Sequence, residues 1–376
     1  MAAVQVGRWK NCYTSNLSKM KIWYVPLEKL EQRMYAQINT QMKASFQRFG
    51  VDFQEILPEY KADQIREGGW VMPAAGHCLF CSQQLAILLQ HLVNGDVGDN
   101  DIIYFDDLWF PGLEALFYSK HLMKKHFSVY GFIHAGSFTY ADFVYPMSTW
   151  ARDLERSWFN ACDGIFVGTK QTKNDIVECG LIADSDKVVI TGLPFNVDTS
   201  LLSNQVVKKE NIIIFAHRDD PDKKVDEFFK LLQLFKKRNF DFKFKVFITG
   251  GGRAVRQSTR GLFASIPEVE FCPNLTKQEY YNILQKSKVM VSTAIQENFG
   301  VCTQEALAFN VVPICPDRLS YHYLLPKEFL YKTSEEAVIM LEKYIKTGLC
   351  ANLLSLVHHP YASDLIVHRI LSANGV

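Results

Sequence analysis

Short, nearly continuous apolar runs alternate along this chain with longer stretches in which apolar residues recur every three or four positions. The runs predict buried strands, and the periodic stretches predict amphipathic helices. In the first half, strands are expected at residues 21–25, 51–57, 102–105, 128–133, 164–167 and 188–191, and helices at 27–48, 82–92, 112–125, 152–161 and 170–179. Strands that alternate with helices indicate an α/β fold with a parallel, doubly wound sheet.

The same alternation starts again at residue 212, and a chain of 376 residues is too long for one ordinary core. Two domains are therefore expected. The second is predicted to contain strands beginning at 212, 244, 269 and 288, and helices at 276–286 and from 305. Residues 310–315 are predicted to form a helix end followed by another strand. The predicted division is an extension at 1–19, a first domain at 20–195, a second at 196–360, and a last helix at 361–376 that packs back on the first domain.

Composition places the chain among ordinary globular proteins, with 48% apolar and 22% charged residues. The formal charge of +1 gives no global electrostatic argument for nucleic acid or for an anionic membrane. No apolar run reaches the roughly 18 residues of a membrane-spanning helix, and the N-terminus lacks a signal-peptide core. The nine cysteines are mostly scattered, which favours reduced thiols, so a cytoplasmic location is expected.

One cysteine pair has the spacing of a metal site. Cys78 and Cys81 are separated by two residues and follow His77. No second pair stands at zinc-site spacing, because the next cysteine is Cys162. The pair is therefore interpreted as core cysteines, and no metal site is expected.

The most informative segment carries two carboxylates, Glu297 and Glu305, on either side of a Phe-Gly turn. A predicted strand at 288–294 leads into this turn, and a helical run opens at Glu305. Free backbone N–H groups and the helix dipole make such a helix N-terminus an anion site. Two acidic groups beside an anion site suit a ligand that carries both phosphates and hydroxyls, such as a sugar nucleotide.

The spacing of the two carboxylates argues against a glycosidase. On one helix they would lie about 12 Å apart, whereas a glycoside hydrolase needs its pair roughly 5–9.5 Å apart. We expect them to grip different parts of one long ligand. The alternative is that Glu297 caps the helix and Glu305 is a solvated helix residue.

This segment resembles the E-x7-E signature of retaining glycosyltransferases of the GT-B fold, family 4 (glycosyl transferases group 1). The glycine that usually precedes the following Pro313 is Asn310 here, and asparagine is also suited to a left-handed helix end. Upstream, Arg218 and Lys223 stand five residues apart after a strand, as in the family. The glycine that usually follows this lysine is Lys224.

The resemblance implies a fold of two Rossmann-like domains, each with a doubly wound parallel sheet, that face a cleft. It also implies a UDP- or GDP-sugar donor as co-substrate, with no bound cofactor or metal. The donor diphosphate would be bound by Arg218, Lys223 and the backbone of Phe299, Gly300 and Val301, the ribose by Glu305, and the sugar by the catalytic Glu297. Two cations after a strand end suit a diphosphate on physical grounds as well.

Residues of the first domain are expected on the acceptor side. His134 ends the strand at 128–133, and the family often carries a histidine there against the donor sugar, so a catalytic role is implied; a structural histidine is the alternative. Asp106 and Asp107 follow the preceding strand and are expected to orient the acceptor. Trp109 is expected either to stack on an acceptor ring or to pack in the core.

The sequence thus predicts a retaining transferase that moves a hexose from a nucleotide sugar to a hydroxyl of a carbohydrate, glycoconjugate or small molecule. Three alternatives stay open: transfer to a modified base in DNA or RNA, as in phages; a glycan phosphorylase, which would need pyridoxal phosphate and usually a longer chain; and an inactive binding module. The nucleic-acid alternative depends on basic residues lining one path to the cleft. The candidates are Arg253, Arg256, Arg260 and the basic run at 120–126.

Overall fold

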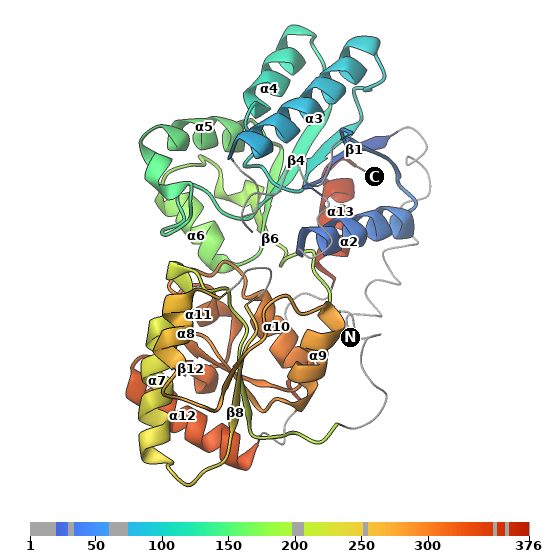
Figure 1. Ribbon diagram of the computed structural model, residues 1–376. Helices are drawn as coiled ribbons and strands as arrows, with labels where there is room; N and C mark the ends of the chain where they lie inside the picture. The colour runs from blue at the N-terminus through green and yellow to red at the C-terminus, as the bar shows by residue number, and fades with distance from the viewer. Residues whose placement is uncertain are drawn as a thin grey trace. The chain divides into compact units, whose positions relative to one another are not determined.

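The computed structural model describes residues 20–28, 34–59, 74–197, 207–250, 255–348, 352–357 and 361–375. The chain forms two compact units that divide between Asn196 and Val197, and the segment from His359 onward belongs to the first unit. Within the described residues each unit holds one six-stranded sheet whose paired neighbours all run parallel. Two doubly wound parallel sheets are therefore confirmed (Figure 1). The expected extension at 1–19 lies outside the described residues.

The sheet of the first unit has the strand order β2-β1-β3-β4-β5-β6. Its strands are β1 (Lys21–Val25), β2 (Asp52–Glu55), β3 (Ile102–Phe105), β4 (Ser128–Ile133), β5 (Gly164–Val167) and β6 (Val188–Ile190). Its helices are α2 (Met34–Phe49), α3 (Ala74–Asn94), α4 (Leu113–Leu122), α5 (Ser148–Ala161), α6 (Lys170–Glu178) and α13 (Ala362–Ala373).

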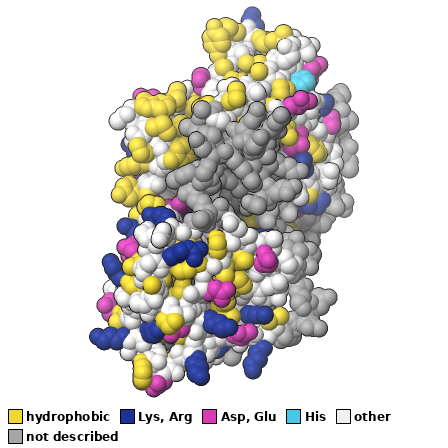
Figure 2. Space-filling view, viewed as in Figure 1, with side chains coloured by type: hydrophobic (Ala, Val, Ile, Leu, Met, Phe, Trp, Pro, Cys, Tyr) yellow, Lys and Arg dark blue, Asp and Glu magenta, His cyan; other side chains and the backbone are white. Residues whose placement is uncertain are grey.

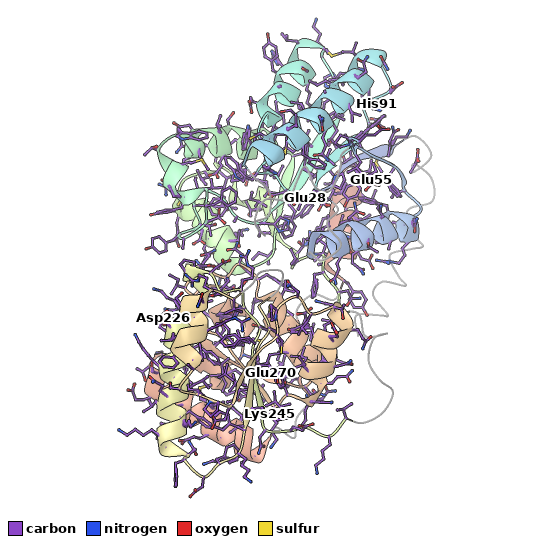
Figure 3. All side chains as sticks on the ribbon, viewed as in Figure 1. Glu28, Glu55, His91, Asp226, Lys245 and Glu270 are labelled. Atoms are coloured by element: carbon purple, nitrogen blue, oxygen red, sulfur yellow. The ribbon has the colours of Figure 1, made fainter. Side chains whose placement is uncertain are left out.

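Helices cover both faces of this sheet. Successive strand residues point to opposite faces, so neighbouring residues of one strand pack on different helices. Trp23 and Val25 of β1 belong to the apolar core that the sheet forms with helices α3 to α6. The residue between them, Tyr24, packs instead on Phe46 of α2, with ring centroids 5.4 Å apart. Glu55 ends β2 (labelled in Figure 3) and accepts hydrogen bonds from α2.

The C-terminal helix α13 lies beside α2 in the first unit (Figure 1). A buried carboxylate joins the two helices: Asp364 Oδ1 accepts from Ser45 Oγ and from Arg48 Nη2, each at 2.5 Å. More than 300 residues of sequence separate these partners. Helix α13 is thus joined to α2 by a polar contact.

The sheet of the second unit has the order β12-β11-β10-β7-β8-β9. Its strands are β7 (Ile212–Phe215), β8 (Lys245–Ile248), β9 (Val269–Phe271), β10 (Val289–Val291), β11 (Val312–Pro316) and β12 (Leu330–Tyr331). Its helices are α7 (Val225–Arg238), α8 (Gln257–Phe263), α9 (Lys277–Lys286), α10 (Val301–Ala308), α11 (Tyr321–Leu324) and α12 (Ser334–Thr347).

Two helices begin four residues earlier than predicted. Helix α5 starts at Ser148, because Tyr145–Met147 already forms a 3-10 turn that leads into it. Helix α10 starts at Val301 rather than at Glu305. Gly300 has a φ of +72°, which turns the chain directly into the helix. The apolar periodicity did not predict this start, because the first turn of α10 contains polar residues. Glu305 therefore lies in the second turn of α10.

Two departures from the family pattern are accommodated by the backbone. Asn310 has a φ of +54°, so the prediction of a left-handed helix end at this position is confirmed. Lys224, which replaces a glycine of the family pattern, has a φ of +50°. Both residues carry the left-handed conformation that glycine adopts most easily.

Candidate functional site

The motif residues of the second unit meet at the carboxyl end of its sheet. Strands β7 and β10 are parallel neighbours, so the segments that follow them leave the sheet side by side. Lys223 comes from the segment after β7, and its Nζ reaches the segment after β10. There it donates to the Gln296 carbonyl oxygen at 2.5 Å and lies 3.5 Å from Glu297 Oε2. The structure thus brings together Lys223 and Glu297, which are 74 residues apart in sequence.

The turn between Glu297 and α10 is held by the same carboxylate. Gly300 donates its backbone N–H to Glu297 Oε1 at 3.0 Å, so Glu297 caps the turn while it pairs with Lys223. A side chain at Gly300 would be strained by the φ of +72°, and its Cβ would lie 3.1 Å from the Tyr321 ring. The Gly300 N–H is therefore engaged by Glu297.

Charge pairing sets the protonation of this centre. Burial by itself would raise the pKa of Glu297, but the Lys223 ammonium and the Gly300 N–H hold that pKa below its ordinary value. Burial would likewise lower the pKa of Lys223, whereas Glu297 and Asp222 raise it. Both groups are thus charged near neutral pH, as a site for phosphates and hydroxyls requires.

Arg218 lies on the rim of this centre. Its Nε is 3.2 Å from Oδ2 of the buried Asp220, and its side chain is 39% exposed. Gly250 packs directly against the backbone of the loop that carries Arg218. A Cβ at Gly250 would lie 2.3 Å from the His217 carbonyl oxygen and 2.9 Å from the Arg218 Cα. The glycine after β8 therefore has a packing reason, because only a residue without a side chain fits beneath Arg218.

Glu305 is buried against α9, and only 2% of the residue is exposed. The alternative that Glu305 is a solvated helix residue was therefore wrong. Its Oε1 accepts a hydrogen bond from Tyr281 OH at 3.2 Å and another from the ammonium of Lys277. Lys277 was not identified from the sequence. It stands 28 residues before Glu305, outside the family motifs, and a lysine at the start of a helix gives no signal of such a partner.

His217 was also not identified from the sequence. It directly precedes Arg218, and its Nε2 lies 2.8 Å from Ser292 Oγ, which in turn lies 2.9 Å from Tyr321 OH. Burial lowers the pKa of His217 to about 4, with a further contribution from the nearby Lys223. A neutral, buried histidine thus supports the loop that carries Arg218. The sequence did not single out His217, because it directly follows the apolar run of a predicted strand.

The predicted residues of the first unit gather at the carboxyl ends of β3 and β4. His134 Nε2 donates to the Asp106 carbonyl oxygen at 2.9 Å, and burial lowers the pKa of His134 to about 4. Asp106 is fully buried and accepts from Tyr24 OH at 2.5 Å; burial raises its pKa to about 7. Asp107 Oδ1 accepts the Trp109 N–H at 3.0 Å, and burial raises its pKa to about 8. These three groups form one contiguous cluster.

Trp109 occupies a core position. Only 9% of the residue is exposed, and its ring centroid lies 5.3 Å from that of Trp158 of α5. Of the two roles considered for Trp109, this geometry matches packing. Exposed aromatic side chains of this unit come later in the chain and include Tyr118 in α4, Tyr140 and Phe143 in the segment after β4, Trp150 in α5, and Tyr361.

In the part of the chain that the structure describes, no group of three or more His, Cys, Asp or Glu side chains is arranged to hold a metal ion. His77 and Cys81 are neighbours on α3, with Nε2 3.7 Å from Sγ. Cys81 is buried but Cys78 is exposed, so the interpretation as core cysteines was wrong for Cys78. Within the same described residues, no helix is both long and apolar enough to cross a membrane.

Comparison with known proteins agrees with this geometry. Residues 198–327 match the family model described as glycosyl transferases group 1. A curated relative, the tRNA-queuosine alpha-mannosyltransferase of Drosophila melanogaster, is 29% identical over 163 residues, which is 39% of this chain and 42% of the relative. The chain therefore matches less than half of that relative's length.

Several solved structures share the fold across nearly the whole chain. The N-terminal domain of Candida albicans trehalose-6-phosphate phosphatase is 12% identical with a TM-score of 0.68, covering 95% of this chain and 97% of that one. The lipopolysaccharide outer core galactosyltransferase WaaB is 11% identical (TM-score 0.62; 94% and 98% covered). The Anabaena protein HepE, solved with UDP, is 9% identical (TM-score 0.59; 95% and 97% covered). At these identities the likeness establishes the fold.

The fold is that of the GT-B class of glycosyltransferases. The resemblance drawn from the motifs is confirmed: the chain carries a glycosyl transferases group 1 domain in its second unit.

Proposed function

We propose that this protein is a retaining glycosyltransferase that moves a hexose from a UDP- or GDP-sugar to a hydroxyl acceptor. The observation that carries the proposal is the centre formed by Lys223, Glu297 and the start of α10, at the carboxyl ends of two adjacent parallel strands. Ligands of open α/β sheets bind at such strand ends. This centre offers a cation and a helix N-terminus to a diphosphate, and a carboxylate to a sugar.

In this proposal the diphosphate is bound by Arg218, Lys223 and the backbone that opens α10 at Val301. Arg218 is the exposed cation of the pair, and its guanidinium can meet two phosphate oxygens at once. Fixed charges and helix dipoles would stabilise the leaving nucleoside diphosphate as the bond to the anomeric carbon breaks. The reaction then proceeds without a divalent metal ion.

Glu297 is the proposed catalytic carboxylate. Its charge would orient the donor sugar and stabilise the positive charge that develops at the anomeric carbon. The acceptor oxygen would attack from the side that the diphosphate leaves, and the acceptor proton would pass to a diphosphate oxygen. Retention of the anomeric configuration follows from that geometry. Glu305 would bind the ribose hydroxyls.

The first unit would supply the acceptor side through His134, Asp106 and Asp107. Their support is positional: all three stand at carboxyl ends of parallel strands and form one hydrogen-bonded cluster. His134 is held neutral by burial, so it can contact a sugar hydroxyl without adding charge. Asp106 is fully buried, so it would act by holding His134 through its carbonyl oxygen, while His134 and Asp107 would orient the bound groups.

A donor-hydrolysis assay tests this function. The purified protein is incubated with a panel of UDP- and GDP-hexoses, and release of the nucleoside diphosphate is followed with and without a chelator. We expect hydrolysis of one donor, unaffected by the chelator and abolished in Glu297→Gln. Activity that requires an added divalent metal would contradict metal-free binding of the diphosphate by Arg218 and Lys223. If no donor released its nucleotide, the proposed glycosyltransferase function would be contradicted.

A tRNA acceptor is the second candidate, and one observation favours it: the Drosophila relative is a tRNA-queuosine alpha-mannosyltransferase. The exposed Tyr140, Phe143 and Trp150 fit a single-stranded acceptor, because aromatic side chains stack on unpaired bases. Transfer of labelled sugar to total tRNA would support this candidate. Equal transfer by wild type and by a Tyr140→Ala, Phe143→Ala, Trp150→Ala triple variant would exclude these three residues from tRNA binding.

A further inference from the structure

Helix α9 directs three side chains at the second carboxylate of the motif. Lys277, Tyr280 and Tyr281 stand at positions i, i+3 and i+4, which share one face of a helix. The Lys277 ammonium and Tyr281 OH both donate to Glu305 Oε1. The hydroxyl of Tyr280 is buried near the same group, and burial together with the Glu305 charge raises its pKa well above the ordinary value.

Lys277 stands where helix electrostatics disfavours it. It is the first residue of α9, at the positive end of the helix dipole, where a cation is unfavourable. The helix start is stabilised independently by a capping box between Thr276 and Glu279. Lys277 is therefore explained by its partners, which are the Glu305 carboxylate and the rings of Tyr281 and Tyr280, with Nζ 4.9 Å and 5.5 Å from their centroids.

The two members of the ion pair differ in exposure. The Lys277 side chain is 39% exposed, whereas that of Glu305 is 2% exposed. A ligand hydroxyl that reaches this carboxylate from solvent therefore passes next to the lysine. Lys277 and Tyr281 both donate to Oε1, and the Tyr280 hydroxyl lies at the same carboxylate, so side chains of α9 fix the rotation of the Glu305 carboxylate.

We propose that Lys277 is a positioning residue of the donor site, which holds the Glu305 carboxylate in the orientation that receives the ribose diol of the nucleotide. The inference rests on the proposed role of Glu305. A carboxylate that is held in place binds two neighbouring hydroxyls without losing further rotational freedom, whereas an unpaired buried carboxylate would rearrange. Lys277 thus acts on nucleotide affinity and leaves the chemical step unchanged.

The test is a double-mutant cycle in which the Lys277 side chain and the ribose hydroxyls of the nucleotide are removed separately and together. Affinities of UDP and GDP are compared with those of their 2′,3′-dideoxy forms, for wild type, Lys277→Ala, Lys277→Gln and Lys277→Arg. For the nucleotide that binds wild type, we expect Lys277→Ala and Lys277→Gln to weaken binding about tenfold or more, with partial recovery in Lys277→Arg. The dideoxy form should bind wild type far more weakly than the ribonucleotide, and that penalty should nearly vanish in Lys277→Ala.

Lys286→Ala is the matched control, because Lys286 is an exposed lysine in the last turn of the same helix. It should leave both affinities unchanged, and kcat of Lys277→Ala at saturating donor should stay within about threefold of wild type. A Lys277→Ala protein that binds the ribonucleotide as tightly as wild type, or more tightly, would overturn the inference. So would a dideoxy penalty of the same size in both proteins.

If wild type binds the dideoxy nucleotide as tightly as the ribonucleotide, Glu305 does not bind the ribose hydroxyls. The inference about Lys277 would then also be wrong. The clamp of Arg218 and Lys223 is tested separately by donor hydrolysis, so the two failures are distinguishable.

Discussion

At the residue scale, the donor site depends on paired charges. The sequence revealed both members of the Lys223–Glu297 pair, but only one member of the pairs that Arg218 and Glu305 form. The motifs located Arg218, Lys223, Glu297 and Glu305 because their spacing is local. Their partners follow from contacts that no spacing encodes: Asp220 for Arg218, and Lys277 for Glu305. Each partner is part of why a buried or half-buried charge is tolerated.

Replacement of Arg218 tests the clamp. Arg218→Ala should lower kcat/KM for the donor by about 10²–10³-fold, because a fixed cation at the leaving group is lost. Arg256→Ala is a matched control, since Arg256 pairs with Asp219 at 2.6 Å in a neighbouring arginine–aspartate contact. It should have little effect on kcat/KM, and both variants should unfold at nearly the wild-type temperature. Equal loss of activity in both would show that local folding, and not the clamp, had been disturbed.

His217 should make stability depend on pH. Its pKa is about 4 in the folded state, lowered from 6.5 by burial and by Lys223. The unfolded chain therefore binds more protons between those values, so the stability that the neutral histidine permits is present above pH 6.5 and is lost as pH falls toward 4. Arg218 also lowers this pKa, while Glu297 and Asp222 oppose the shift.

Urea unfolding at several pH values measures this effect. Between pH 6.5 and 4 the free energy of unfolding should fall more steeply for wild type than for His217→Gln, which cannot titrate. Parallel curves for the two proteins would mean that His217 is protonated in the folded state without cost.

At the element scale, the apolar pattern predicted the alternation of strands and helices, and it failed where a special backbone conformation sets a boundary. The start of α10 depends on Gly300 at a φ of +72°, and the start of α5 on a 3-10 turn. Trp109 shows the complementary limit. A loop aromatic is ambiguous in sequence, and only the packing of α5 against its ring decides the question.

The contact between α13 and α2 should carry measurable stability. Asp364→Ala removes a nearly buried carboxylate that binds Ser45 and Arg48. Because Arg48 is 38% exposed and thus partly screened, we expect a loss of about 1–3 kcal/mol in the unfolding free energy rather than the full cost of a buried pair. Asp153→Ala removes an exposed pair with Arg156 and should cost about 0.5 kcal/mol or less. Equal losses in urea unfolding would contradict a special role for α13.

At the scale of the whole molecule, two parallel sheets were predictable because length and alternation together leave few other arrangements. The sixth strand of the second sheet, β12, was not predicted, because it is only two residues long. The acceptor was not, because acceptor recognition uses side chains that differ between members of a fold class. Charge gives little help: Figure 2 shows basic and acidic side chains interspersed over the second unit, in keeping with a net charge of +1.

The stereochemistry of transfer tests the central claim most directly. Proton NMR of the anomeric signal, recorded while the purified protein consumes its UDP- or GDP-hexose, compares the configuration of donor and first-formed product. The account predicts the same anomeric configuration in both, with loss of the reaction in Glu297→Gln. A product of inverted configuration would contradict the assignment of a retaining glycosyltransferase.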